Sequence, residues 1–198
     1  MSDVICVSNR NLCNEDFLVR IESIAKEHPK AILLREKDLS ERSYHALAKD
    51  VLQICDKYGT PCILHSFVNV AKELKWYAIH LPFASLQSLN ETDKKQFTIL
   101  GASCHSVEEA VMAEQMGCTY IIVGHIFSTD CKKGLEPRGL SFLEEICKRV
   151  SISVYAIGGI NAQNVQEVRK AGALGVCMMS GLMTCESPKD FFEKACRR

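Results

Sequence analysis

Short apolar segments alternate with amphipathic segments along the whole chain. Eight apolar segments are rich in β-branched residues, and several are continuous rather than alternating, which is typical of strands covered on both faces. The predicted strands span residues 3–9, 31–37, 61–66, 77–82, 98–105, 119–127, 153–159 and 175–181. The segments between them show apolar residues at helical spacing.

Start signals precede several of the predicted helices. Ser40 stands at the N-cap position before a helix predicted over residues 41–58, and the sequence SVEE at 106–109 matches a capping box. Asn161 precedes a helix predicted over residues 162–171, and Ser187-Pro188 opens the last helix.

Eight strand–helix units in 198 residues leave about 25 residues for each unit, which is close to the lower size of a TIM barrel. The pattern therefore predicts an α/β fold, a single-domain (β/α)8 TIM barrel over residues 1–198, with an open doubly wound sheet as the alternative. No linker or break in composition indicates a second domain.

Charge and cysteine content narrow the class of protein. The 24 basic residues equal the 24 acidic ones, so the net charge of zero argues against a nucleic-acid partner or a membrane partner. The first ten residues show no signal-peptide pattern, and no apolar run reaches the roughly 18 residues of a membrane span. The eleven cysteines form no CxxC pair and many lie in apolar runs, which predicts free thiols and a cytoplasmic location.

Polar residues gather where the predicted strands end, and in a TIM barrel the active site lies at the carboxyl ends of the strands. They are Arg35, Lys37, His65, His80, Ser103, His105, His125, Thr129, Lys132 and Lys133. Gly158-Gly159 and Ser180-Gly181 follow the last two strands, where this fold commonly binds phosphate through backbone N–H groups. Tight turns are the alternative explanation of these four residues.

Arg35 and Lys37 are two positions apart, so their side chains are predicted to share one face with Glu36 opposite. A ligand phosphate or carboxylate would pair with them, and a buried structural ion pair is the alternative. The histidines at the strand ends also raise the question of a divalent metal. Because no carboxylate accompanies them, we expect no metal and a hydrogen-bonding role for His65, His80 and His105.

Several motifs together resemble the thiamine phosphate synthase/TenI superfamily. They are LREKDLS at 34–40, HL at 80–81, GASCHSVEEA at 101–110, GCTYIIVGHIFSTDCKKG at 117–134, AIGGINAQNV at 156–165 and the final GVCMMSG. They occur in order through nearly the whole chain. The resemblance implies a TIM barrel that serves thiamine biosynthesis, and because family members are often dimers it suggests a homodimer.

The departures from the synthase pattern concern magnesium. Synthases join a pyrimidine pyrophosphate to a thiazole phosphate while magnesium neutralises the leaving pyrophosphate. Where they carry Gln, Asn-Asp and Asp, this chain has Leu33, His65-Ser66 and Ser85, and Cys131 replaces the second Thr of a TxTK pattern. Both expected magnesium carboxylates are therefore missing, and His and Ser are poor replacements for this hard cation.

The segment GHIFSTDCKKG at 124–134 is most similar to TenI-like thiazole tautomerases. The implied reaction isomerises a 2-carboxy dihydrothiazole phosphate to the aromatic 2-carboxythiazole phosphate, without a cofactor. An imidazole that titrates near ~6.5 can both accept and donate a proton, so His125 is the expected catalytic residue. A histidine that only forms a hydrogen bond at the barrel rim is the alternative for His125.

The other site residues follow from this substrate, a small phosphorylated thiazole. Arg35 and Lys37 would hold its carboxylate, with Ser103, Thr129 and Lys132 nearby, and the backbone of Gly158, Gly159, Ser180 and Gly181 would bind its phosphate. We therefore expect an isomerase. A magnesium-dependent thiamine phosphate synthase and a non-catalytic regulatory protein that binds a phosphate ligand are the two alternatives.

Overall fold

The computed structural model describes residues 3–129, 132 and 134–195. Its eight strands are parallel and form a closed barrel in which the strand order β1 to β8 follows the chain. The predicted (β/α)8 barrel is therefore confirmed. All eight predicted strands are present, and each of them is shorter at one or both ends than the apolar pattern predicts.

The chain divides into two compact units, residues 1–79 with 178–198 and residues 80–177. The expected single domain over residues 1–198 stays a prediction. Each unit contains strands followed by helices, and the two are described in turn.

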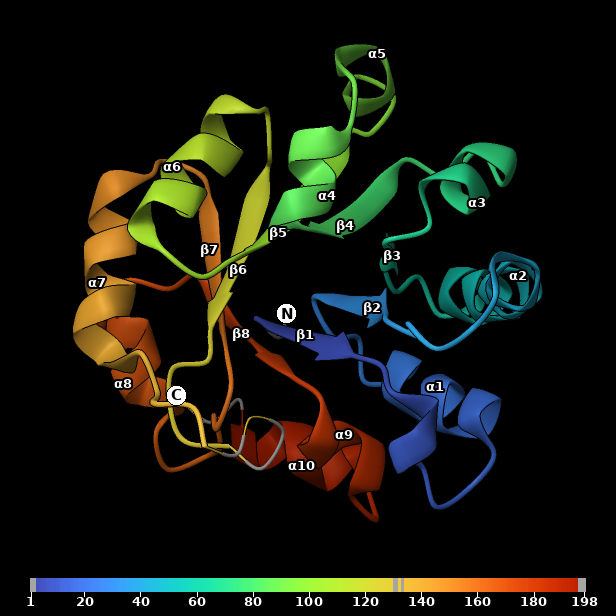
Figure 1. Ribbon diagram of the computed structural model, residues 1–198. Helices are drawn as coiled ribbons and strands as arrows, with labels where there is room; N and C mark the ends of the chain where they lie inside the picture. Colours follow the sequence, from blue (N-terminus) through green and yellow to red (C-terminus); the bar gives the residue numbers. More distant parts are fainter. Residues whose placement is uncertain (1–2, 130–131, 133, 196–198) are drawn as a thin grey trace. The chain divides into compact units, whose positions relative to one another are not determined.

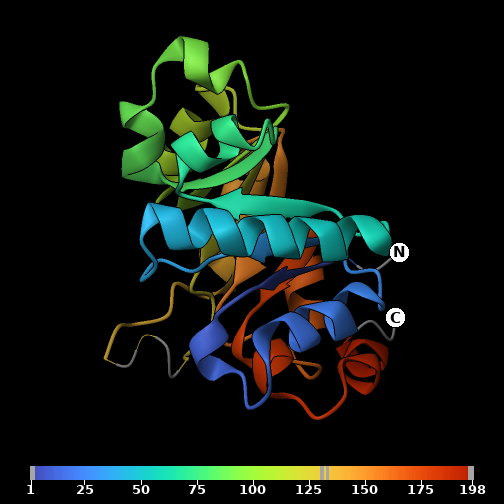
Figure 2. The same cartoon turned by 90° about the vertical axis from the view of Figure 1, so that its right-hand side faces the viewer.

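The first unit contains β1 (Val4–Val7), β2 (Ala31–Leu34) and β3 (Cys62–His65), and every residue of these strands is buried. Its helices are η1 (Arg10–Leu12), α1 (Phe17–Ala25), α2 (Glu41–Lys57), α3 (Val68–Glu73), α9 (Ser180–Thr184) and α10 (Pro188–Ala195) (Figure 1). The hydroxyl of Ser40 accepts a hydrogen bond from the Ser43 N–H at 3.2 Å, which confirms the predicted cap of α2. Figure 2 shows α2 along its full length.

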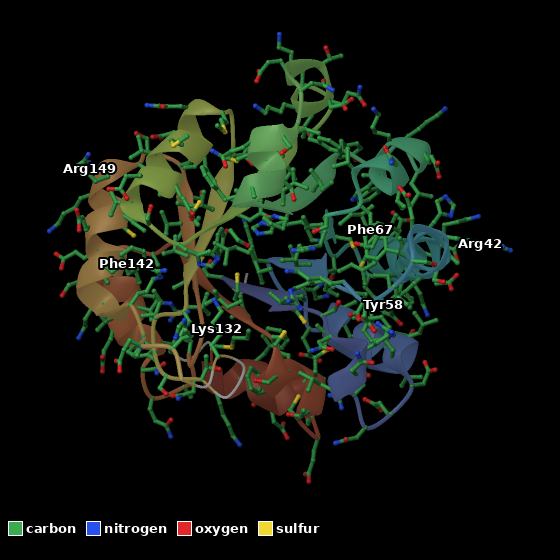
Figure 3. The ribbon with its side chains drawn as sticks, in the orientation of Figure 1. Arg42, Tyr58, Phe67, Lys132, Phe142 and Arg149 are labelled. Atoms are coloured by element: carbon green, nitrogen blue, oxygen red, sulfur yellow. The ribbon has the colours of Figure 1, made fainter. Side chains whose placement is uncertain are left out.

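Tyr44 connects α2 to the ends of two strands of the first unit. It belongs to the buried face of α2 and is fully buried. Its hydroxyl donates to the Leu34 carbonyl at 2.7 Å and accepts from the His65 N–H at 2.9 Å. Phe67, labelled in Figure 3, stacks on the Tyr44 ring with centroids 4.2 Å apart. These bonds hold the carboxyl ends of β2 and β3 at a fixed register.

The second unit contains β5 (Ile99–Cys104), β6 (Tyr120–Gly124) and β7 (Ser153–Ile157), together with most of β4 (Ala78–Pro82) and β8 (Gly175–Met178). Its helices are α4 (Phe83–Ser88), α5 (Glu91–Lys94), α6 (Val107–Gln115), α7 (Gly139–Arg149) and α8 (Val165–Lys170). Gly101 and Ser103 on β5 lie beside Tyr120 and Ile122 on β6. Figure 1 shows α6 and α7 side by side along the outside of these strands.

Two helix starts differ in detail from the prediction. The Ser106 hydroxyl accepts from the Glu109 N–H as a capping box requires, but the Glu109 carboxylate accepts from the N–H of His105, one residue earlier. Helix α8 begins at Val165 rather than at residue 162. Asn161 and Asn164 accept hydrogen bonds from nearby backbone N–H groups, and these short-range bonds stabilise a turn before the helix.

No helix in the described part of the chain is long and apolar enough to cross a membrane. The nine cysteines that the structure describes are free, and six of them are buried: Cys6, Cys55, Cys62, Cys104, Cys118 and Cys177. The expectation of free, mostly buried thiols is confirmed for these residues.

Candidate functional site

The strand ends of the first unit carry a buried carboxylate, Glu36, that is saturated with hydrogen bonds. The Ser8 hydroxyl donates to it at 2.6 Å, and Arg10 donates to it through its backbone N–H and its guanidinium, each at 3.1 Å. The same guanidinium forms two bonds to Asp38, at 2.6 and 2.5 Å, and lowers the pKa of that carboxyl well below its usual range. The network fixes the loops after β1 and β2 against each other.

This network determines where the two predicted substrate-binding cations lie. Strand β2 ends at Leu34, so Arg35 and Lys37 belong to the loop after it rather than to one face of the strand. The Arg35 N–H donates to the Ser8 hydroxyl at 2.9 Å. Arg35 is half-buried, Lys37 is exposed and Glu36 is buried between them. Glu36 forms a partly buried ion pair with Arg10, at 3.1 Å.

At the end of β3, His65 and Ser66 stand where synthases carry Asn-Asp. His65 is 3% exposed, and its Nδ1 lies 2.7 Å from the Ser66 hydroxyl. The expected hydrogen-bonding role of His65 is confirmed. Ser85, at the third departure, is an exposed residue of α4.

In the second unit, a chain of hydrogen bonds joins side chains from β4, β5 and β6. His80 is buried, its Nε2 lies 2.8 Å from the Ser103 hydroxyl and its Nδ1 lies 3.1 Å from the Tyr120 hydroxyl. Ser103 is half-buried and Tyr120 is buried. Burial raises the pKa of the Tyr120 hydroxyl well above that of an ordinary phenol. A Cβ on Gly101 would lie 2.1 Å from a carbon of the Tyr120 ring, so glycine there makes room for this ring.

His125 follows β6 directly and is 6% exposed. Its Nε2 donates to the Leu135 carbonyl at 3.3 Å, and its own carbonyl accepts from the Arg138 N–H at 3.0 Å. The Nδ1 of His105 donates to the carbonyl of Gly124, which precedes His125, at 2.9 Å. His125 therefore anchors both ends of the loop between β6 and α7, and the expected hydrogen bond of His105 is confirmed.

Gly158 and Gly159 lie against this loop. Both have positive φ, 101° and 66°, and a Cβ on Gly158 would lie 2.3 Å from the Cβ of His125. The Phe127 N–H donates to the Gly158 carbonyl at 3.0 Å. The close approach of the two backbones explains the glycine pair in physical terms, and phosphate binding there stays a prediction.

Ser180 and Gly181 begin the short helix α9 of the first unit. A Cβ on Gly181 would lie 2.8 Å from the Phe191 ring of α10, so close packing of these two helices requires a small residue there. Phosphate binding by this pair also stays a prediction.

The remaining predicted residues belong to the loop between β6 and α7. The Lys132 N–H donates to the Thr129 carbonyl at 3.0 Å, which forms a turn, and Lys132 is exposed. Figure 3 labels Lys132 in this loop. Cys131 and Lys133 lie outside the described residues.

The donor set does not fit the magnesium ion that the synthase resemblance implies. Within residues 3–129, 132 and 134–195, no three side chains of His, Cys, Asp or Glu come together in a way that could hold a metal. Ser66 bonds to His65, and Glu36 is committed to Ser8 and Arg10. Magnesium prefers hard oxygen ligands, usually carboxylates, and the residues at the three departure positions supply no carboxylate.

Tyr120 and Arg10 are the polar partners that sequence reasoning missed. Tyr120 reads as one more aromatic residue of a strand, and its role emerges only from the register that places it beside Gly101. Arg10 lies 26 residues before the carboxylate it pairs with, and no periodicity links the two.

Comparison with known proteins extends these observations. A family described as "Thiamine monophosphate synthase" matches residues 4–182. The thiamine-phosphate synthase of Clostridium tetani is 35% identical over 170 residues, which cover 83% of this chain and 78% of that protein. The thiamine-phosphate synthase of Desulfitobacterium hafniense is 34% identical over 180 residues, with coverage of 88% and 85%.

A solved structure agrees with these sequence relatives. The thiamine phosphate pyrophosphorylase from Pyrococcus furiosus superposes with a TM-score of 0.82 at 27% identity, and the match covers 98% of this chain and 93% of that one. The resemblance to the superfamily and to thiamine biosynthesis is therefore confirmed.

The same names show that the expected enzyme class, isomerase, is wrong. The relatives are synthases, which join two substrates and are transferases. The prediction relied on His125 within GHIFSTDCKKG as a proton carrier. In the structure the Nε2 of His125 bonds to a backbone carbonyl and anchors a loop, which explains a histidine at this position without proton transfer.

Proposed function

Because this chain belongs to the thiamine monophosphate synthase family, we propose that it is a transferase that joins a pyrimidine pyrophosphate to a thiazole phosphate. The observation that carries the proposal is the match to synthases along almost the whole chain, at 34% and 35% identity. In this reaction, the bond between the pyrimidine group and the pyrophosphate breaks, and a bond to the thiazole forms.

Departure of pyrophosphate concentrates negative charge on the leaving group, so the first task of the protein is to stabilise phosphoryl oxygens. Arg35 is the favoured cation of the first unit, because Glu36 and Asp38 are occupied by Arg10 and Ser8 holds the Arg35 backbone. In the second unit, the Ser103 hydroxyl and the Lys132 ammonium group are the proposed donors. Lys37 and Thr129 are lesser candidates.

The thiazole phosphate requires a second anion site. We assign it to backbone N–H groups of Gly158 and Gly159, with Ser180 and Gly181 as further candidates. His125 packs against Gly158: its Cα and Cβ occupy the space that a Cβ on Gly158 would need. Within this proposal His125 positions the loop and transfers no proton.

The role of Arg35 can be tested by product formation. Purified protein is mixed with both substrates, and thiamine phosphate is measured by chromatography with pyrophosphate release measured in parallel. We expect equal amounts of both products, and a loss of about tenfold to 100-fold in kcat/KM for Arg35→Gln, the scale of one hydrogen bond to a charged group. Arg42→Gln is the matched control, because Arg42 is an exposed cation on α2 (Figure 3) and no role is proposed for it.

The proposal fails if neither product forms at any magnesium concentration. A second function is favoured by one observation: His65, Ser66 and Ser85 stand where synthases place acidic and amide ligands. A protein that binds phosphate esters without turnover would need no such ligands. Saturable binding of the thiazole phosphate, measured by calorimetry without product formation, would support that function.

A further inference from the structure

We infer that Tyr120 and His80 form a relay that sets the direction of the Ser103 hydroxyl, so that Ser103 donates its proton to a phosphoryl oxygen of the ligand. The inference deepens the proposed function and rests on it for the class of ligand. Ser103 is the residue in contact with the ligand, and His80 and Tyr120 are positioning residues. All three side chains belong to the second unit, on adjacent strands.

The first step is the proton of Tyr120. The phenol is 5% exposed, and burial keeps it protonated, so its O–H must donate to some acceptor. Among the described residues, the hydrogen-bond partner found for this hydroxyl is His80 Nδ1, at 3.1 Å. The phenol therefore donates to Nδ1, which must be the unprotonated nitrogen of a neutral imidazole.

The second step follows from the ring of His80. With Nδ1 unprotonated, the proton of the neutral ring is on Nε2, which lies 2.8 Å from the Ser103 hydroxyl. A doubly protonated ring is disfavoured because His80 is 1% exposed, and burial penalises the charged form. Nε2–H donates, and the Ser103 oxygen accepts.

The third step is the proton of Ser103. Because its oxygen accepts from His80, the hydroxyl proton points away from the imidazole. Ser103 lies near the carboxyl end of β5 and is half-buried, so this proton is accessible to a ligand, whereas Tyr120 and His80 are not. A hydroxyl held as a donor suits an acceptor-only group such as a phosphoryl oxyanion.

The packing around the relay supports a fixed geometry. The Tyr120 ring occupies the space that a side chain on Gly101 would fill, and the Tyr155 ring meets it edge-on with centroids 6.0 Å apart. Gly101 and Ser103 are two residues apart on β5 and share a face. The strand that makes room for the phenol therefore also presents the hydroxyl that the phenol controls.

Nitrogen-15 NMR of labelled protein tests the relay without any substrate. The chemical shifts of the two ring nitrogens distinguish the tautomers, and we expect His80 to carry its proton on Nε2. In Tyr120→Phe, Nδ1 loses its donor and the ring should populate both tautomers. A wild-type ring protonated on Nδ1 overturns the inference, and this measurement needs no variant to fold.

Calorimetry with inorganic pyrophosphate tests the ligand. We expect affinity to fall about tenfold or more in Ser103→Ala and about twofold to fivefold in Tyr120→Phe, since the second change only frees the hydroxyl to turn. Tyr155→Phe is the matched control, because it removes a hydroxyl from a buried neighbouring ring and leaves the three relay side chains in place. It should bind like the wild type.

The outcomes separate this inference from the proposed function. If pyrophosphate binds and depends on Ser103 but no thiamine phosphate forms, the relay stands and the transferase is wrong. If the transferase is active but Ser103→Ala binds pyrophosphate as tightly as the wild type, the relay is wrong. Absence of pyrophosphate binding to the wild type also overturns the inference.

Discussion

The strand ends of the two units solve the same problem, burial of polar groups, in opposite ways. In the first unit, Glu36 is a buried charge that accepts from Ser8 and Arg10, and Asp38 completes the network with a second carboxylate. In the second unit, hydrogen bonds join the buried Tyr120 and His80 to the half-buried Ser103, and the inferred relay through them is neutral. Both arrangements join residues distant in sequence.

The difference shows which region is free to bind. In the charged network, the donors that contact Glu36 are all used within the protein. The network therefore fixes the loop that carries Arg35 and Lys37. The neutral chain ends at a half-buried hydroxyl whose proton has no need of an internal acceptor. A charged network thus stabilises the backbone, while a neutral one presents a single oriented donor.

The largest expected effect comes from the buried charge. Glu36→Leu leaves the Arg10 guanidinium, the Arg10 N–H and the Ser8 hydroxyl without their acceptor, and we expect a loss of about 3–5 kcal/mol in the free energy of unfolding. Urea denaturation followed by circular dichroism measures it. Glu36→Gln, which keeps the shape and one acceptor, should lose less. Equal, small losses below about 1 kcal/mol in both variants would show that the network contributes little.

The next effect tests the room made for the neutral chain. Gly101→Ala places a methyl group 2.1 Å from a carbon of the Tyr120 ring, and displacement of this ring should cost about 1–3 kcal/mol. The same substitution in a Tyr120→Leu background should cost less, because the clashing ring atoms are gone. Denaturation of the four proteins gives the coupling energy. Strictly additive losses would argue that Gly101 is not small on account of Tyr120.

The fold could be predicted from the sequence because its signals are local and repeated. Each continuous apolar segment predicts one strand, and each cap such as Ser40 predicts the start of one helix. Eight repetitions of this pattern leave few alternatives to a barrel. The strand ends were less accurate. Residues 35–37 continue the strand pattern, but in the structure β2 ends at Leu34. Beyond it, Glu36 bonds to Ser8 and Arg10, and the Arg35 N–H bonds to Ser8, in place of the strand pairing.

The site was predicted only as a set of positions. His80, Ser103 and His125 were identified from their places after or within strands, and the structure confirms hydrogen bonding for His80. Their partners could not be predicted, because Tyr120 and Leu135 meet them through strand register and loop closure. The enzyme class failed for the same reason: a histidine beside a polar loop looks the same in sequence whether it transfers a proton or anchors the loop.

The smallest expected effect distinguishes the charged region from the neutral one by pH. Arg10 lowers the pKa of Asp38 below the ~3.9 of a free aspartate. The ion pair therefore stabilises the fold fully above pH ~4, and this stabilisation is lost as the pH falls from ~4 through the lowered pKa of Asp38. Asp38→Asn should therefore be less stable than the wild type near pH ~7, and the difference should shrink below pH ~4. Urea midpoints at several pH values measure it.

Tyr120→Phe supplies the contrast on the neutral side. Because burial raises the pKa of the Tyr120 phenol, the folded protein keeps this group protonated throughout the acid and neutral range. The phenol itself then adds no pH dependence to the stability difference between Tyr120→Phe and the wild type from pH ~3 to pH ~8, whereas the Asp38→Asn difference shrinks at its acid end. If both differences shrink together in acid, a group other than Asp38 titrates in both variants, and the division into a charged and a neutral region does not hold.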